Sequence, residues 1–398
     1  MSDARIERHR MRRFSSYLLA GIAIVTLAGT TLQMAFSDQT DGDVASHLPV
    51  LKAGDMTVAA IPSALAGAAV KSGRPTDTPA LAVPPTILCG NGSKGIFYGI
   101  GGHVGQGGVY DKMSYEQQLR HIKELGMTMY GHDVFDYAST QKVLRIAKLA
   151  KKQCIGVFAA LTADLNAYAN EDAAYRDGLK LGMMVATTLK GVVQYYQVGN
   201  EYENVSIRRG QGSSPDDYDN ASFQKARGSI LGMIDGIKRA NPSATIVMCP
   251  LGWLHFGFLD MLYTGTQPDG SRGHRIPKWD ITAWHWYSDM GDITAARGVN
   301  VLRRLHETYR KPIWITELGV RPGASEQASA AYLVGPNALG GLIQYAKQYN
   351  IQNVTLYELL DDEAYGGDGN YGLLGNDGTV RKHRYDVIKR FIATHAMP

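Results

Sequence analysis

Cysteine is scarce in this sequence: only Cys89, Cys154 and Cys249 occur among 398 residues. None of them forms a CxxC or Cys/His zinc pattern, and three are too few for a disulfide-dense mini-protein. Cys154 and Cys249 fall near the third and fifth predicted strands, which are not neighbours, so no disulfide is expected between them. We therefore expect buried free thiols and no structural metal site.

A large excess of one charge is also missing. The net charge is +4, and residues 1–13, with five arginines and two acidic residues, supply three of these charges. Because the remaining basic residues are not clustered, the charge gives no support for nucleic-acid binding. No phosphate-binding motif opens a helix either. The glycine-rich residues 99–108 (GIGGHVGQGG) fit a loop better than a dinucleotide site.

Charged residues are absent from residues 14–37, and residues 17–36 are mostly apolar. Twenty helical residues span about 30 Å, the thickness of the hydrocarbon core of a bilayer. The arginine-rich flank at 1–13 predicts a cytoplasmic N-terminus. We therefore expect a single-pass signal anchor at 14–37 in the inner membrane, with the rest of the chain periplasmic. A signal peptide cleaved near Ala35, giving a secreted protein, and a buried core helix are the alternatives.

Residues 38–88 are rich in Ala, Pro, Gly, Ser, Thr and Asp and show no sustained periodicity. This composition predicts a flexible linker that holds a domain away from the membrane. The alternative is an N-terminal extension that packs loosely on the folded domain.

From residue 96 onward, eight short apolar runs alternate with amphipathic stretches. The runs are too apolar for half-exposed strands, which indicates a parallel sheet covered by helices. The count of eight favours an α/β fold of the (β/α)₈ TIM-barrel type over 89–398, rather than an open doubly wound sheet. The predicted strands are 96–100, 128–130, 155–160, 192–198, 245–249, 281–285, 313–316 and 353–357. The predicted helices are 114–125, 140–152, 173–189, 223–240, 301–310, 328–349 and 384–395.

Two glutamates stand at predicted strand ends, where barrels of this type place their chemistry. Glu201 follows the fourth run and Glu317 follows the seventh. Strands four and seven lie on opposite sides of an eight-strand ring, so the two side chains can flank one bound sugar. Hydrolysis of a glycoside with retention uses an acid and a nucleophilic carboxylate about 5–5.5 Å apart.

The segments around these glutamates, YQVGNEYEN and WITELGV, resemble those of the clan of retaining β-glycoside hydrolases with (β/α)₈ barrels. The resemblance extends over about residues 95–392. It is closest to families 39 and 5 and to barrels encoded beside bacterial exopolysaccharide synthesis genes. It implies that Glu201 is the acid/base and Glu317 the nucleophile, with the pKa of Glu201 raised by burial and by the second carboxylate. The chain departs from many relatives at Gly131-His132-Asp133, which lacks an arginine that supports the nucleophile.

The resemblance also implies a set of substrate contacts. Asn200 would donate to the sugar 2-hydroxyl, Tyr287 or His285 would hydrogen-bond Glu317, and aromatic rings would stack on sugar faces. The full predicted set is His103, Asp133, Asn200, Trp253, His285, Trp286, Tyr287 and Tyr357. Trp286 and Tyr357 fit a position in the hydrophobic core equally well. His103 is equally consistent with a loop residue that contacts no substrate. Glu203 remains an alternative acid, and Glu358 an alternative nucleophile.

These observations predict a membrane-anchored retaining β-glycoside hydrolase that is endo-acting on a polysaccharide. We expect no metal or organic cofactor, since no HxH follows the first strand as in metal-dependent barrel hydrolases. The resemblance points to exopolysaccharide synthesis or export machinery as a partner. A transglycosidase using the same residues, or an inactive polysaccharide-binding or assembly barrel, are the alternatives.

The predicted topology can be tested with reporter fusions placed within residues 38–88. A reporter that is active only outside the cytoplasm should be active, because the arginine flank keeps the N-terminus inside. The same fusion without residues 14–37 is the control and should be inactive. Activity of a reporter that works only in the cytoplasm would refute export.

Overall fold

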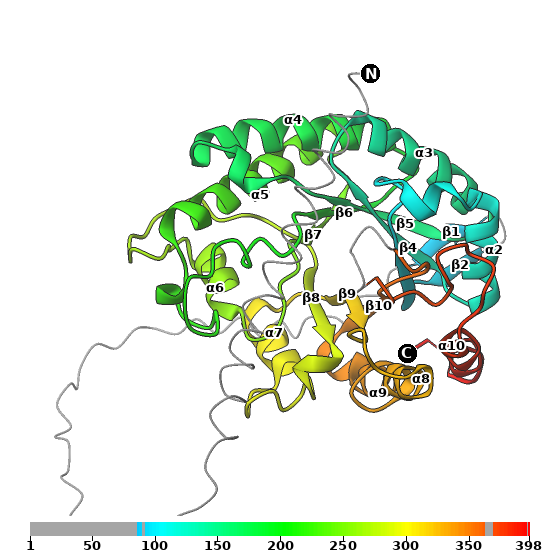
Figure 1. Cartoon of the computed structure of the whole chain (residues 1–398). Coiled ribbons are helices and arrows are strands. Elements are labelled where there is room, and N and C mark those ends of the chain that lie inside the picture. The colour runs from blue at the N-terminus through cyan, green and yellow to red at the C-terminus, as the bar shows by residue number, and fades with distance from the viewer. Residues whose placement is uncertain (1–85, 90–91, 363–368, 396) are drawn as a thin grey trace, which may run out of the picture. The chain divides into compact units, whose positions relative to one another are not determined.

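The computed structural model describes residues 86–89, 92–362, 369–395 and 397–398. Eight parallel strands lie side by side in the order β7-β6-β5-β4-β3-β10-β9-β8, with helices around them (Figure 1). Parallel bridges from Val247 to Ile281 and from Leu251 to Trp284 join β7 to β8 and close the ring. The predicted (β/α)₈ barrel is confirmed. Its strands are β3 (Tyr98–Gly102), β4 (Met129–Val134), β5 (Gly156–Leu161), β6 (Tyr195–Val198), β7 (Thr245–Met248), β8 (Thr282–Tyr287), β9 (Ile313–Gly319) and β10 (Ile351–Leu356).

The helices of the outer shell begin where polar side chains cap them. Ser114 and Asp136 form capping boxes at the starts of α2 and α3, which satisfy backbone N–H groups that lack helical partners. The helices are α2 (Tyr115–Leu125), α3 (Tyr137–Lys152), α4 (Glu171–Leu189), α5 (Asn220–Ala240), α6 (Phe256–Thr264), α7 (Val301–Tyr309), α8 (Glu326–Val334), α9 (Leu339–Tyr349) and α10 (His383–Thr394).

Two helix predictions need correction. The predicted helix 328–349 is two helices, α8 and α9, because Gly335 and Pro336 follow α8 and proline cannot continue a helical hydrogen-bond ladder. Helix α6 was not predicted. It is apolar around most of its circumference and largely buried, so it lacks the amphipathic period that identifies a surface helix.

The N-terminal boundary also differs from its prediction. An antiparallel hairpin of β1 (Thr86–Cys89) and β2 (Gly92–Gly95) precedes the barrel, so regular structure begins within the predicted linker. The predicted basic flank (1–13), membrane span (14–37) and nearly all of the linker lie outside the described residues. Within the described residues, no helix is long and apolar enough to cross a bilayer.

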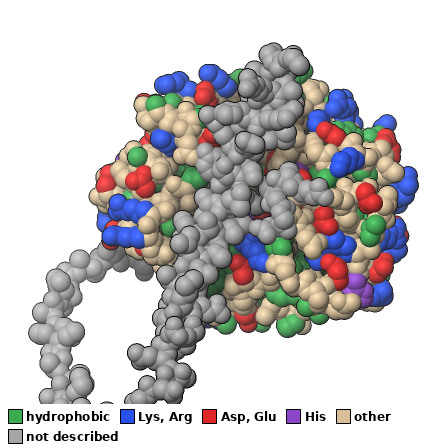
Figure 2. Space-filling model, in the orientation of Figure 1, with side chains coloured by type: hydrophobic (Ala, Val, Ile, Leu, Met, Phe, Trp, Pro, Cys, Tyr) green, Lys and Arg blue, Asp and Glu red, His purple; other side chains and the backbone are tan. Residues whose placement is uncertain are grey.

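Charged side chains of both signs are interspersed over the coloured surface in Figure 2.

The cysteines are only partly as expected. Cys249 is a buried free thiol, whereas Cys154 is disulfide-bonded. The order of the strands excludes only a bond between Cys154 and Cys249, and Cys154 can still pair elsewhere.

Glycines let helices α4 and α5 pack with their backbones in contact. A Cβ atom at Gly182 would lie 2.3 Å from the Met233 carbonyl oxygen, and one at Gly232 would lie 2.1 Å from the Tyr175 carbonyl oxygen. Both distances are far below van der Waals contact, so only glycine fits. This glycine seam fixes α4 against α5, the helices that precede and follow β6.

We expect Gly232→Ala to destabilise the barrel. Alanine gains about 1 kcal/mol of helix propensity, but overpacking against a backbone carbonyl costs about 1–3 kcal/mol or more, so the free energy of unfolding should fall. Chemical denaturation provides the measurement. Gly375→Ala is the control, because its Cβ would make only an ordinary 3.5 Å contact with Val380. Equal stability of the two variants would contradict the packing argument.

Candidate active site

The two predicted glutamates meet at the end of the barrel where the strands finish. One oxygen of Glu201, one oxygen of Glu317 and a nitrogen of His285 all lie within 4.8 Å of one another. Glu201 follows β6 in a turn with positive φ values at Gly199 and at Glu201 itself. The nearest oxygens of the two carboxyl groups therefore lie no more than 4.8 Å apart, close to the separation of about 5–5.5 Å that is associated with retention.

The pairing of β8 with β9 brings His285 beside Glu317. Trp284 is paired with Ile315 and His285 with Glu317, so the register shifts by one residue between the two pairs. Such irregularities re-aim side chains and are common next to active sites. Here the shift places the Glu317 carboxylate next to the His285 imidazole.

His285 and Tyr287 hold the two carboxylates. His285 is fully buried, and its Nδ1 lies 2.8 Å from Glu201 Oε1 and 3.4 Å from Glu317 Oε2. The Tyr287 hydroxyl donates to Glu317 Oε2 at 2.5 Å. The predicted hydrogen bond from Tyr287 to Glu317 is thus present, and the buried imidazole of His285 contacts both acids.

Further hydrogen bonds fix the loop after β6. Asn204 Nδ2 donates to Glu201 Oε2 at 3.0 Å, and the Glu201 backbone N–H donates to the Pro250 carbonyl at 3.1 Å. Gln197 Nε2 donates to Asn200 Oδ1 at 3.1 Å. Since no described residue accepts a hydrogen bond from Asn200 Nδ2, that group is available to a ligand.

The pKa of Glu201 shifts in the opposite direction to the one expected, and the pKa of Glu317 is raised instead. Burial disfavours the carboxylate of Glu201, but the hydrogen bond and charge of His285, with the charge of Arg321, outweigh it and lower the pKa of Glu201. Burial and the charge of Glu201 raise the pKa of Glu317 against the effects of His285 and Tyr287. The expected rise in the pKa of Glu201 is therefore wrong in direction, because His285 was not predicted to contact Glu201.

The alternation of side chains along β8 separates its predicted ligand contacts. His285 and Tyr287 face the carboxylates, while Trp284 and Trp286 share the opposite face. Trp286 is fully buried, stacks on Trp253 at 6.0 Å and donates to the Gly291 carbonyl. This position removes Trp286 from the set of sugar contacts. Trp253 is partly exposed and stays in it.

The other predicted contacts form a second polar group near the first. His103 Nδ1 lies 2.5 Å from Asp133 Oδ2, and its Nε2 lies 3.4 Å from Glu358 Oε2. Burial opposes the charge on His103, but Asp133 and Glu358 raise its pKa to about 10. Burial raises the pKa of Glu358 to about 8. Tyr357, 9% exposed, packs with two other tyrosines beside this group.

Exposure distinguishes the proposed catalytic acids from their alternatives. The side chains of Glu201 and Glu317 are 25% and 20% exposed, whereas Glu203 and Glu358 are fully buried. A carboxyl group must touch the glycosidic bond to act on it, so the first pair is better placed than either alternative.

Arg321 is a site residue that the sequence analysis missed. Its guanidinium carbon lies 3.9 Å from the centre of the Tyr287 ring, and its Nε pairs with Asp289 at 3.1 Å. It lies two residues beyond the end of β9 and supplies a cation near the acids. In many relatives the arginine that supports the nucleophile is expected instead at the position of residues 131–133, on β4.

Glu201, His285 and Glu317 are also of the types that bind transition metals such as Zn²⁺. His285 Nδ1 contacts both acids, and Tyr287 and Asn204 donate to them. His285 Nε2 is buried and has no hydrogen-bond partner among the described residues.

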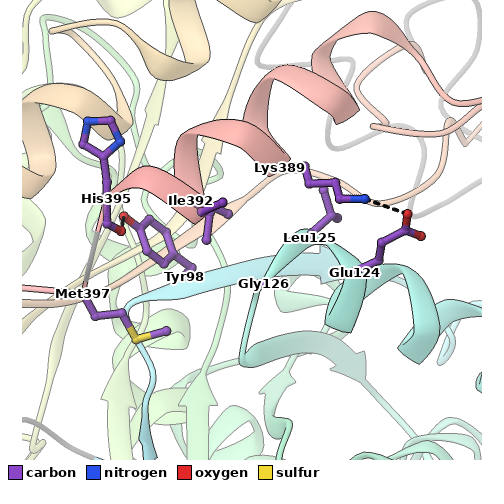
Figure 3. Close-up of a pocket in the computed structure, with 9 residues that line it drawn as sticks. Tyr98, Glu124, Leu125, Gly126, Lys389, Ile392, His395 and Met397 are labelled. Atoms are coloured by element: carbon purple, nitrogen blue, oxygen red, sulfur yellow. Dashed lines mark hydrogen bonds and ion pairs between the residues drawn. The ribbon is translucent and has the colours of Figure 1, made fainter.

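A cavity of about 350 Å³ lies at the opposite end of the barrel, between α2 and α10 (Figure 3). The Lys389–Glu124 ion pair and the hydrogen bond from Tyr98 to the His395 carbonyl border it. Since Tyr98 opens β3 and Gly126 ends α2, this cavity is remote from the acids and takes no part in their chemistry.

Comparisons with known proteins agree with the fold. A family model described as glycosyl hydrolase catalytic core matches residues 267–336. Among solved structures, virulence factor SghA from Agrobacterium tumefaciens aligns with a TM-score of 0.57 at 12% identity, covering 75% of this chain and 96% of that one. The family 1 β-glucosidase from Thermotoga maritima aligns with a TM-score of 0.57 at 13% identity, covering 75% and 98%. No curated protein matches the chain.

Removing the Tyr287 hydroxyl should raise the pKa of Glu317 further, because that hydroxyl stabilises the carboxylate. Tyr287→Phe is the variant, and ¹³C NMR titration of protein labelled at glutamate carboxyl carbons is the measurement. The Glu317 signal is assigned by its loss in Glu317→Gln. Tyr309→Phe, which removes a hydroxyl bonded to Asp260, should leave the titration unchanged. An unchanged or lowered midpoint in Tyr287→Phe would contradict this role.

Proposed function

We propose that this chain hydrolyses β-glycosidic bonds with retention of configuration, using Glu201 as acid/base and Glu317 as nucleophile. The observation that carries the proposal is the approach of the two partly exposed carboxylates within 4.8 Å, bridged by His285. The match of residues 267–336 to a glycosyl hydrolase model supports the same chemistry.

In the first step, a Glu317 oxygen attacks the anomeric carbon while the bond to the leaving oxygen breaks. Glu201 gives its proton to that oxygen, so an ester forms at Glu317 and the aglycone departs neutral. Tyr287 and His285 orient Glu317 for attack. Asn200 Nδ2 donates to the sugar 2-hydroxyl, a contact that strengthens as positive charge develops on the sugar.

In the second step, Glu201 accepts a proton from water, and the water oxygen displaces Glu317 from the anomeric carbon. The free sugar leaves, Glu317 is again a carboxylate and Glu201 again carries a proton. Two inversions at the same carbon give net retention.

The first step requires the proton on Glu201, although His285 lowers the pKa of Glu201 and burial raises the pKa of Glu317. His285 Nδ1 lies within hydrogen-bond reach of Glu201 and 3.4 Å from Glu317, so the titrations of the three groups are coupled. The reactive form has the proton on Glu201 and the charge on Glu317, and the oxocarbenium-like charge of the transition state is stabilised by that ionised Glu317.

For the substrate we propose a β-linked polysaccharide cut internally, with an exopolysaccharide and its synthesis or export machinery as the biological setting. Support comes from the solved neighbours described as β-glucosidases, from SghA with its substrate analog salicin, and from the partly exposed Trp253 as a stacking surface. We further propose that the domain is tethered by residues 14–37 outside the cytoplasm. The disulfide at Cys154 supports this, because disulfides persist in oxidising compartments.

The two glutamates should separate in mutants assayed with aryl β-glycosides and a panel of β-linked polysaccharides. Glu317→Ala should abolish the glycosyl-enzyme step, and azide should restore turnover with inverted product. Glu201→Ala should lower kcat by about 10²–10⁴-fold for poor leaving groups and spare good ones. Azide should then yield glycosyl azide of retained configuration, since it attacks the intermediate without a base.

Full activity in either variant would defeat the assignment. Equal losses for all leaving groups in Glu201→Ala would count against its acid role. Products longer than the substrate would identify transglycosylation on the same two residues.

A further inference from the structure

Tyr287 is surrounded by three residues from one short segment, and the two steps above give one of them, Arg321, no role. The Tyr287 hydroxyl donates to Glu317 Oε2 at 2.5 Å. Tyr287 is paired with Gly319 across the two strands, and the guanidinium carbon of Arg321 lies 3.9 Å from the centre of the tyrosine ring. Glu317, Gly319 and Arg321 therefore all lie against the same side chain.

We propose that Arg321 is a positioning residue: its guanidinium holds the Tyr287 ring against β9, so that the tyrosine hydroxyl keeps the Glu317 carboxylate oriented for attack. This role rests on the proposed function. It depends on where the ring lies and not on any effect of the Arg321 charge on the two acids.

Gly319 makes room for the ring on β9. A Cβ atom at Gly319 would lie 2.5 Å from Tyr287 Cε1, far below van der Waals contact. Glu317 and Gly319 both follow the register shift in this strand pair, and side chains two residues apart share one face of a strand. Because Gly319 has no side chain, the ring can lie along this face with its hydroxyl at Glu317.

Arg321 lies over the ring and is itself held in place. A guanidinium at this distance is in contact with the ring, and its planar shape suits stacking on an aromatic face. Its Nε donates to Asp289 Oδ1 at 3.1 Å, and its Nη1 donates to the Tyr371 hydroxyl at 3.3 Å. The Arg321 backbone N–H donates to Ser288 Oγ at 3.0 Å. Since Ser288 and Asp289 directly follow Tyr287, these bonds tie the end of β8 to the segment after β9.

Two further tyrosines pack on Tyr287 and are the alternative means of holding it. The Tyr357 and Tyr371 rings make edge contacts with it, at centre-to-centre distances of 6.1 and 6.0 Å. Tyr371 also accepts the hydrogen bond from Arg321, so part of this packing depends on the arginine. Whether the tyrosines suffice without Arg321 is what the experiment decides.

A double-mutant cycle tests the role. Arg321→Ala should lower kcat/KM for an aryl β-glycoside that the wild type hydrolyses by about 10–100-fold, because a misplaced nucleophile loses its geometry of attack. In a Tyr287→Phe background, which already lacks the hydroxyl, the same substitution should change kcat/KM by less than about twofold. Where Arg321→Ala fails to fold, Arg321→Lys is used in the same cycle.

The matched control is Arg275→Ala. Arg275 also pairs with an aspartate, Asp235, and lies over a tyrosine ring, that of Tyr175 on helix α4. Losing it should leave kcat/KM unchanged, because neither the ring nor the ion pair belongs to the site.

Chemical rescue separates shape from charge. The Arg321 side chain is 34% exposed, so guanidinium ion can enter the space that Arg321→Ala leaves, and it should restore activity at concentrations that keep the protein folded. Methylammonium at the same concentration should not. Arg321→Lys keeps the charge without the planar donor group, so it should remain impaired.

A crystal structure of Arg321→Ala supplies a readout without substrate. The Tyr287 hydroxyl should lie beyond hydrogen-bond reach of Glu317, more than about 3.5 Å away. An unchanged hydrogen bond there would overturn the role, and so would full activity in Arg321→Ala or Arg321→Lys. Losses that multiply in the double mutant would also overturn it, since Arg321 would then act without Tyr287.

Failure of the proposed function is distinguishable from failure of this role. It would appear as unimpaired turnover in Glu201→Ala or Glu317→Ala, and it would leave the structural result for Tyr287 unaffected.

Discussion

The hydrogen bond between His285 and Glu201 is the interaction on which the arrangement of the site depends. Two carboxylates this close repel each other when both are ionised, and their partial burial strengthens the repulsion. The fully buried imidazole of His285 lies between them and reduces this repulsion, because its Nδ1 contacts an oxygen of each carboxylate. Tyr287 donates to the Glu317 oxygen that faces His285, and Asn204 donates to the second oxygen of Glu201, so three side chains fix the geometry of the acids.

The barrel explains how residues so distant in sequence reach this arrangement. Glu201 and Glu317 stand at the ends of β6 and β9, and β8 lies beside β9 in the ring. Closure of β7 onto β8 brings the β6 and β7 loops to the same mouth. Parallel strands all finish at one end, so any polar residue at a strand end converges there. The glycine seam between α4 and α5 supports the shell on the side of Glu201.

Much of the fold followed from periodicity alone. All eight strands were located because each is a short apolar run bounded by helical stretches. The predictions 128–130 and 313–316 end too early, since β4 is Met129–Val134 and β9 is Ile313–Gly319. Helix α6 was not predicted because a nearly uniformly apolar helix shows no amphipathic period. The prediction of one helix over 328–349 overlooked Gly335-Pro336, which interrupts an otherwise continuous pattern. Glu201 and Glu317 were found because their position at strand ends is a property of the linear sequence.

Other properties of the site depend on three-dimensional neighbours and could not be deduced in the same way. The direction of the pKa shift at Glu201 is set by His285, 84 residues away in sequence. The burial of Glu203 and the stacking of Arg321 on Tyr287 arise from loops whose paths have no periodic signal. For Trp286 the sequence left a sugar contact and a core position equally open, and alternation along β8, which places it on the face opposite His285, favours the core position that the structure shows.

The two faces of β8 also constrain which insertions this chain tolerates. One face carries His285 and Tyr287 toward the acids, and the other carries Trp284 and Trp286 into the hydrophobic shell. Adding or deleting a single residue within the strand would exchange the faces, exposing indole rings at the mouth and burying an imidazole among helices. Insertions and deletions among homologues of this chain should therefore occur in the loops and not within β8.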